Sequence, residues 1–308
     1  MRARVLFLTD RASHREELRL AQSALSELAI AFSQSISMRE QMLPEDCNPD
    51  DLSQLMLDND AILFCGSQAN LGRVAGLAQA YAASAQVNHH VQGLGLSRLK
   101  TDRAPALRLV WPLEDSPEAL TRAATLACAQ AKASGSNVAY LTGNHDKGWW
   151  EALSRAAMYA ALPAPQPLTL DGALWNLLNT DKPAPLLMAN PMDAALLRHL
   201  LAYLGGSELI HYQCLHTEKM EIQAVVPQGP GNKLPFFSLL YAVAQALRNT
   251  LHMTREGDCL DTATSNVLAS GWRTAEFGQV DKVIPDAEAL DLVNQQVRLA
   301  GELYERLG

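Results

Sequence analysis

The chain has 308 residues, of which 48% are hydrophobic and 19% are charged, and its formal net charge is −8. This length fits one large domain or two, and the negative charge argues against nucleic acid and anionic membranes as partners. No apolar run approaches the roughly 20 residues that a membrane-spanning helix needs, so we expect no membrane segment either.

The cysteines indicate the redox environment of the chain. They are odd in number, widely spaced and without a C-x-x-C pair: Cys47, Cys65, Cys128, Cys214 and Cys259. Such usage is typical of a reducing compartment, where thiols pack as small hydrophobic groups. The N-terminus enters the apolar run Val5–Leu8 without the cleavage pattern of a signal peptide. We therefore expect a cytoplasmic protein.

The first part of the chain predicts strands separated by helices. Arg4–Leu8 and Ala61–Cys65 are short apolar runs that indicate buried strands. Apolar residues recur between them at helical spacing, at Leu18, Ala21, Leu25, Leu28 and Phe32. Residues 72–85 are also expected to be helical. This alternation favours an α/β fold with a mainly parallel sheet.

The middle of the chain continues the same alternation. Leu107–Leu113 and Val138–Leu141 predict strands, and the helix between them has Ser116 as N-cap and Pro117 at its first position. That helix is expected to stop at Ser134–Gly135. A strand, a turn and a helix follow in succession, over Leu186–Ala189, Asn190–Pro191 and Met192–Leu204.

The segment Thr264–Phe277 (TSNVLASGWRTAEF) closely resembles the penultimate segment of the isocitrate/isopropylmalate dehydrogenase family, the β-decarboxylating dehydrogenases. In that family a helix carrying V-L-x-x-G-x-R-T leads to A-D. The preceding Leu234–Leu251 is similar to the family's long apolar helix, and Gly229–Pro235 (GPGNKLP) echoes its Gly-Lys-Gly-x-Ala-Asn-Pro. Ala189–Asp193, with the helix after it, is similar to the family's Asp-Asn strand end and Phe-Gly-Asp turn.

The resemblance implies an isopropylmalate dehydrogenase-like α/β fold, with two subdomains around a mixed, largely parallel sheet and a cleft between them. Residues 1–90 and 235–308 would form the first subdomain, which is discontinuous. Residues 91–234 would form the second, which includes the dimerisation region, so that a homodimer is implied. The family oxidises a 2-hydroxy acid with NAD or NADP and then releases CO2, using Mg2+ or Mn2+.

Few catalytic positions of the family have a counterpart in this chain. Asp193 matches a metal-binding aspartate, but the position four residues later is Leu197. Gly143 occupies the place of the catalytic lysine, and the nearest lysine is Lys147. His145 lies between them, just after a predicted strand, where α/β proteins often place ligand-binding groups. Lys147, His145 and Asp193 are therefore the candidate catalytic residues, with Asp193 also the candidate metal ligand.

The nucleotide-binding segments, and the segment that carries the family's proton-transferring tyrosine, are altered as well. Thr9–Ser13 (TDRAS) stands where the family has a glycine-rich loop, and Trp111–Pro117 lacks the family's tyrosine. His216 is the counterpart of the first residue of the family's His-Gly-Ser-Ala-Pro-Asp loop. Asn232 lies in Gly229–Pro235, which is similar to the family's Gly-Lys-Gly-x-Ala-Asn-Pro segment after that loop. The resemblance thus implies that His216 and Asn232 would contact a cofactor.

Three functions are compatible with these observations. The losses favour a divergent, non-catalytic relative that binds a small carboxylate or a partner. The second is an NAD(P)-dependent oxidoreductase acting on a 2-hydroxy (di)carboxylic acid with a rebuilt site. The third is a regulatory subunit of a heteromeric dehydrogenase, for which exposed apolar surface on the isolated chain would be a sign.

Overall fold

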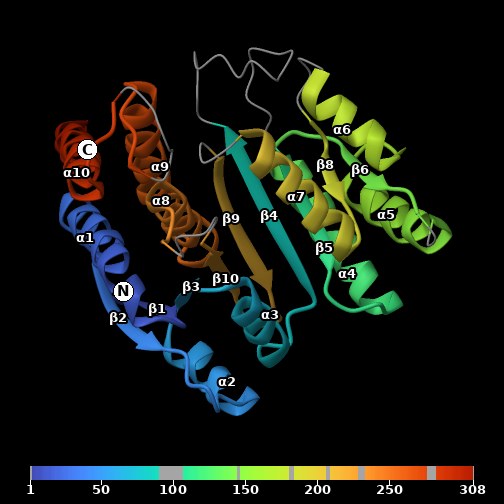
Figure 1. Cartoon of the computed structure of the whole chain (residues 1–308), viewed down its shortest axis with the longest axis horizontal. Coiled ribbons are helices and arrows are strands. Elements are labelled where there is room, and N and C mark those ends of the chain that lie inside the picture. The colour runs from blue at the N-terminus through green and yellow to red at the C-terminus, as the bar shows by residue number, and fades with distance from the viewer. Residues whose placement is uncertain are drawn as a thin grey trace. The chain divides into compact units, whose positions relative to one another are not determined.

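The computed structural model describes residues 2–89, 107–143, 146–179, 184–205, 209–227, 233–275 and 282–307 (Figure 1). The chain divides into two compact units: unit 1 comprises Met1–Gln79 and Tyr212–Gly308, and unit 2 comprises Ala80–His211. The domain boundaries expected from the sequence, at 90/91 and 234/235, stay a prediction. Among the described residues, no helix has both the length and the apolar composition to cross a membrane.

Unit 1 contains strands in the order β2-β1-β3-β10-β9. Their bounds are β1 (Arg2–Thr9), β2 (Ser35–Met42), β3 (Ala61–Cys65), β9 (Leu209–His216) and β10 (Glu221–Val225). The first four strands in this order run parallel, and β9 is antiparallel to β10. All five side chains of β3 are buried, as expected for a parallel strand covered on both faces.

The helices of unit 1 pack around these strands. Their bounds are η1 (Ala12–His14), α1 (Arg15–Ala31), α2 (Pro49–Asp58), α3 (Gln68–Leu77), α8 (Phe236–Gln245), the π-helical turn η3 (Ala246–Thr250), α9 (Thr254–Ala269) and α10 (Asp286–Leu307). Every residue from Phe236 to Ala244 is buried, so α8 is the central helix of the unit. α1 and α10 lie side by side (Figure 1).

Unit 2 has the strand order β4-β5-β8-β6-β7. Its strands are β4 (Ala82–His89), β5 (Leu107–Pro112), β6 (Val138–Leu141), β7 (Gln166–Leu168) and β8 (Leu186–Met188). Its helices are α4 (Pro117–Ala133), α5 (Asp146–Ala160), α6 (Leu170–Asn179) and α7 (Pro191–Gly205). β4 is antiparallel to β5, and β5, β8, β6 and β7 run parallel.

A cluster rich in alanine forms the core between α4, α5 and the strands of unit 2. Ala123, Ala124, Ala127 and Ala131 of α4 are fully buried and pack with Leu153 of α5. Their small side chains let the helices and strands approach closely, so that the core is densely packed without large apolar side chains.

The α/β class and the mixed, largely parallel pairing expected from the sequence are confirmed in both units. The prediction of a helix over residues 72–85 is wrong in its second half, where β4 begins at Ala82. β4 pairs with β5 from Ala82 to Val87 and buries Ala82 and Ala83. Pairing and burial therefore override the helix propensity of the alanines.

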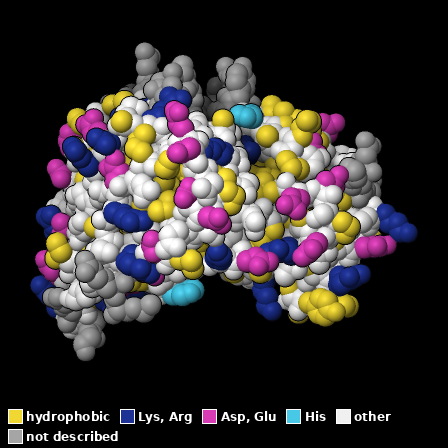
Figure 2. All heavy atoms as spheres, turned by 90° about the horizontal axis from the view of Figure 1, so that it is seen from below, with side chains coloured by type: hydrophobic (Ala, Val, Ile, Leu, Met, Phe, Trp, Pro, Cys, Tyr) yellow, Lys and Arg dark blue, Asp and Glu magenta, His cyan; other side chains and the backbone are white. Residues whose placement is uncertain are grey.

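The surface carries charges of both signs. On the face shown in Figure 2, Lys and Arg side chains are interspersed with Asp and Glu. Apolar side chains also reach the surface of the described residues, with Met158 and Tyr159 of α5 being 67% and 80% exposed.

Candidate functional site

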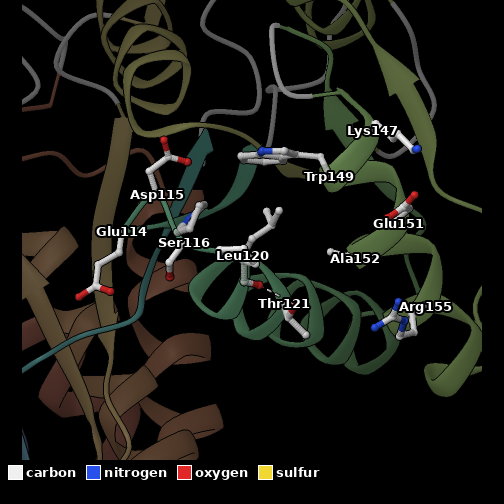
Figure 3. A pocket seen from close by; sticks show the side chains of 13 residues that line it. Glu114, Asp115, Ser116, Leu120, Thr121, Lys147, Trp149, Glu151, Ala152 and Arg155 are labelled. Atoms are coloured by element: carbon white, nitrogen blue, oxygen red, sulfur yellow. Dashed lines mark hydrogen bonds between the residues drawn. The ribbon is translucent and has the colours of Figure 1, made fainter.

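A pocket of about 520 Å³ lies in unit 2 where the N-terminal ends of α4 and α5 meet (Figure 3). This volume is within the range that small-molecule sites occupy. Figure 3 shows Trp149 of α5 lying over Leu120 of α4. Ala152 joins them, and the three side chains give the pocket an apolar middle.

Charged side chains line this pocket on two sides. They are Glu114 and Asp115 in the connection before α4, and Lys147, Glu151 and Arg155 along α5. The three residues of α5 are spaced by four, so they share one face of that helix. The pocket therefore offers two carboxylates on the side before α4, and two cationic groups with the Glu151 carboxylate between them on the side of α5.

The start of α4 is built as the sequence predicts. Ser116 is extended, and its side chain accepts a hydrogen bond of 3.1 Å from the backbone N–H of Ala119. Pro117 follows at the first helical position, where no N–H is required. Because helix N-termini carry partial positive charge, the ends of α4 and α5 add to the field that Lys147 and Arg155 create.

The structure brings one candidate catalytic residue to this pocket. Lys147 is exposed and lines it, whereas His145 lies outside the described residues. Asp193 is not among the lining residues. It lies in the first turn of α7, where its carboxylate accepts a hydrogen bond of 2.8 Å from the Asn190 side chain and its N–H donates to the Asn190 oxygen at 2.8 Å. Asn190 therefore caps α7, and the Asp193 carboxylate is occupied by the Asn190 amide.

Of the two candidate cofactor-binding residues, Asn232 lies outside the described residues and His216 is buried. His216 ends β9, is 2% exposed, and its Nδ1 is 3.3 Å from Oε1 of Glu221 on β10. The ligating atoms of Cys214, His216 and Glu221 all lie within 4.8 Å of one another. In the part of the chain that the structure describes, these three residues form a group that is able to hold a metal ion.

The pKa values of Cys214 and Glu221 are set by burial and by the interactions of the Glu221 carboxylate with its neighbours. Burial raises the pKa of the Cys214 thiol, and the charge of Glu221 raises it further. For Glu221, burial acts to raise the pKa, but hydrogen bonds from His216, Asn249 and Cys214 outweigh it and leave the pKa below its usual value.

A second polar cluster, which the sequence analysis did not single out, surrounds Asp10 in unit 1. Asp10 directly follows β1, and its Oδ2 accepts hydrogen bonds from the backbone N–H of Ser67 (2.8 Å), the Ser67 hydroxyl (2.6 Å) and Asn70 Nδ2 (2.9 Å). Gly66 leaves room for the carboxylate, because a Cβ there would lie 2.7 Å from Oδ1. The cluster thus lies at the carboxyl ends of β1 and β3, where α/β sheets commonly bind ligands.

The Asp10 carboxylate is buried but keeps its charge. Burial acts to raise the pKa of Asp10, whereas the hydrogen bonds from Ser67 and Asn70 and the nearby His14 lower it, and the net pKa lies below the usual value. Its Oδ1 is buried without a hydrogen-bond partner among the described residues, and His14 Nδ1 is 4.0 Å away. One signal for this residue exists in the sequence, since an aspartate directly follows a buried strand.

The segment on which the family resemblance rests has a clear structural role. α9 ends at Ala269, and Gly271 has a φ of +87°, a conformation that favours glycine. Arg273 is 4% exposed, and its Nη1 donates to the carbonyl oxygens of Leu268 (2.6 Å) and Trp272 (2.7 Å). The Gly-Trp-Arg-Thr run therefore ends α9, and its buried guanidinium donates to one carbonyl of the last helical turn and to one just after the helix.

No protein-family model and no curated protein matches the sequence. The structure is similar to that of a β-decarboxylating dehydrogenase from Thermococcus kodakarensis in its apo form, with a TM-score of 0.76, 15% identity and 98% of each chain covered. A protein from Thermus thermophilus also matches at a TM-score of 0.76, with 14% identity over 96% of this chain and 68% of the other. The chain therefore has the fold of a β-decarboxylating dehydrogenase, as the sequence resemblance implied.

Proposed function

We propose that this protein is a non-catalytic relative of the β-decarboxylating dehydrogenases that binds a small carboxylate in the pocket of unit 2. The observation that carries the proposal is the arrangement of the pocket. Lys147 and Arg155 line one side, with Glu151 between them, and Trp149 and Leu120 form an apolar middle. A ligand carboxylate would pair with the guanidinium of Arg155, while its carbon chain would contact the apolar middle.

The loss of the parent reaction is supported by two positions of α7. Leu197, where the resemblance implies a second metal-binding aspartate, is fully buried in the core and has no atom that ligates Mg2+. Asp193 is engaged with Asn190, and one aspartate is a poor site for a cation that demands octahedral oxygen ligation. Gly143, at the end of β6, likewise offers no side chain for proton transfer.

The Asp10 cluster favours a second candidate function, an NAD(P)-dependent oxidoreductase with a rebuilt site. Oδ1 of Asp10 is a buried acceptor without a partner in the described residues, and a ligand hydroxyl would satisfy it. The neighbouring Ser67 and Asn70 supply further polar groups at the same strand ends. This candidate predicts that a dinucleotide binds to unit 1.

A thermal-shift titration distinguishes the two candidates. The full chain is titrated with isopropylmalate, isocitrate, malate and tartrate, and separately with NAD+ and NADP+, each with and without Mg2+. A ligand that binds only the folded state adds about 2.7 kcal/mol of stability at 100 times its Kd. We expect a saturable shift with at least one carboxylate, no Mg2+ requirement and no reduction of NAD+ or NADP+ in its presence.

Amino-acid substitutions test whether the carboxylate binds in the pocket of unit 2. Lys147→Ala combined with Arg155→Ala is expected to abolish the carboxylate shift, because both cationic groups of the pocket are removed. Lys132→Ala is the matched control, since Lys132 is exposed near the end of α4 and does not line the pocket. A shift with a dinucleotide that Asp10→Ala removes would support the oxidoreductase, and the absence of any carboxylate shift would refute the proposed function.

A further inference from the structure

We propose that the β9–β10 hairpin of unit 1 carries a zinc site made of Cys214, His216, Glu221 and Gln223. The site is independent of the carboxylate pocket, which lies in unit 2, and it goes beyond the proposed function.

The register places the four side chains on one face of the hairpin. His216 is directly opposite Glu221 in the antiparallel ladder, and Cys214 is paired with Gln223. Directly opposite residues point to the same side of a sheet, and so do residues two apart along one strand. The four side chains therefore form a two-by-two array on a single face.

The distances within the array are close to those around a tetrahedral ion. His216 Nδ1 is 3.3 Å from Glu221 Oε1, and Gln223 Nε2 is 3.4 Å from both Cys214 Sγ and Glu221 Oε2. With zinc bonds of about 2.3 Å to sulfur and about 2.1 Å to nitrogen or oxygen, neighbouring tetrahedral ligands lie about 3.4–3.6 Å apart. The ligand atoms of Cys214, His216 and Glu221 lie within 4.8 Å of one another, so rotations of these side chains bring them to the spacing that zinc requires.

Gln223 completes the array, and in the structure its Nε2 faces the Cys214 sulfur and the Glu221 carboxylate. It is 1% exposed, and its Oε1 is buried without a hydrogen-bond partner among the described residues, which is unusual for a buried amide. A half-turn of the side-chain amide exchanges its nitrogen and oxygen positions. The oxygen then faces the Cys214 sulfur and the Glu221 carboxylate, where it completes a set of one sulfur, one nitrogen and two oxygen ligands.

Donor chemistry and charge select zinc over hard cations. A thiolate and an imidazole are preferred by zinc, whereas Mg2+ and Ca2+ prefer oxygen ligands alone. The Cys214 S–H bond is broken on ligation, its proton leaves to solvent, and the sulfur forms the bond to zinc. The thiolate and the Glu221 carboxylate together neutralise the two positive charges of the ion, as a buried site requires.

The site also has an entry path. Cys214 and His216 are 7% and 2% exposed, but the side chain of Glu221 is 29% exposed. A hydrated cation can therefore meet the Glu221 carboxylate first and pass from it to the buried ligands.

Cobalt spectroscopy of the full chain tests the site. The protein is treated with a chelator, dialysed and titrated with Co2+. We expect a thiolate-to-cobalt charge-transfer band and tetrahedral d–d bands that saturate near one equivalent, and loss of both on adding zinc. Absence of the charge-transfer band from the wild-type chain would overturn the proposal, and this readout does not depend on any variant folding.

Variants then identify the sulfur. Cys214→Ala is expected to remove the charge-transfer band, and Gln223→Leu is expected to weaken Co2+ binding by at least about tenfold. Cys128→Ala is the matched control, because Cys128 is equally buried but lies in the alanine-rich core of unit 2. A band that Cys214→Ala retains would also overturn the site. Neither result bears on carboxylate binding in unit 2.

Discussion

The guanidinium of Arg273 lies at the end of α9, where it donates to the carbonyl oxygen of Leu268 in the last helical turn and to that of Trp272 just after it. These two acceptors are backbone carbonyls within five residues of Arg273 in sequence. The segment therefore has a local structural reason for its glycine and arginine, which is independent of any catalytic role.

We expect Arg273→Ala to lower the free energy of unfolding by about 2–3 kcal/mol, because hydrogen bonds from a charged donor are lost and carbonyl oxygens stay buried. Urea denaturation of the two proteins measures the difference. Ser270→Ala is the control, since the Ser270 side chain is exposed and bonds only its own helix. A similar small change for both variants would contradict the capping role.

The contribution of Asp10 to the free energy of unfolding is expected to depend on pH. The folded-state pKa is lowered relative to an unfolded value of about 3.9. The carboxylate therefore stabilises the fold above that value, and the contribution is lost as the pH falls through the folded pKa. We expect the free energy of unfolding to drop more between about pH 6 and about pH 3 in the wild type than in Asp10→Asn.

Urea denaturation at the two pH values measures this drop. Asp291→Asn, at an exposed position of α10, serves as the control and should keep the wild-type pH dependence. If Asp10→Asn also kept the wild-type pH dependence, the hydrogen bonds of Asp10 would not stabilise the charged form of its carboxylate.

The residues of the candidate sites differ in how visible they are in the sequence. Lys147 was predictable, because it follows a recognisable strand and begins a helix. Asp10 was not, because its partners Ser67 and Asn70 are 57 and 60 residues away and only the parallel pairing of β1 with β3 brings them together. The array around Cys214 was also missed, because the sequence does not give the register of β9 and β10.

Among the elements, strands with a continuous run of large apolar residues were predictable, and the edge strand β2 was not. β3 and β6 match the expected Ala61–Cys65 and Val138–Leu141 residue for residue, because their apolar runs are buried on both faces. β2 has no such run, since it lies at the edge of its sheet and its side chains are exposed or half-buried. An edge strand takes its position from the neighbouring strand more than from its own pattern.

Two glycines show how helix packing decides the effect of the same substitution. A Cβ at Gly301 of α10 would lie 2.8 Å from the carbonyl oxygen of Ala31, whereas a Cβ at Gly72 of α3 would meet nothing within 4 Å. We expect Gly301→Ala to destabilise the protein by about 1–3 kcal/mol, because α1 and α10 must separate. Gly72→Ala should stabilise it by about 0.4–1 kcal/mol, since alanine favours the helix.

Chemical denaturation of the two variants checks these opposite signs. Equal effects at the two positions would show that the α1–α10 contact is looser than the structure indicates.

For the whole molecule, the resemblance implies a homodimer formed through the middle of the chain. α5 exposes Trp150, Met158 and Tyr159, at 41%, 67% and 80%, and large apolar and aromatic side chains are typical anchors of interfaces. We expect light scattering to give twice the 33.5 kDa mass of the chain, and Tyr159→Glu to shift the population toward the monomer.

The control for the dimer is Ile30→Glu, because Ile30 is 74% exposed on α1 of unit 1 and lies far from α5 in sequence. A wild-type mass of one chain would refute the homodimer, and equal dissociation by both variants would place the contact elsewhere than on α5.

The distribution of the cysteines has a practical consequence for measuring how each unit opens. All five are buried and free, and burial raises the pKa of each thiol, to about 11 for Cys128 and Cys259. An alkylating reagent needs an accessible thiolate, so labelling must await local opening. Because Cys128 alone lies in unit 2, its alkylation rate reports the opening of that unit, and the rates at the other four report the opening of unit 1 in the unmodified wild-type chain.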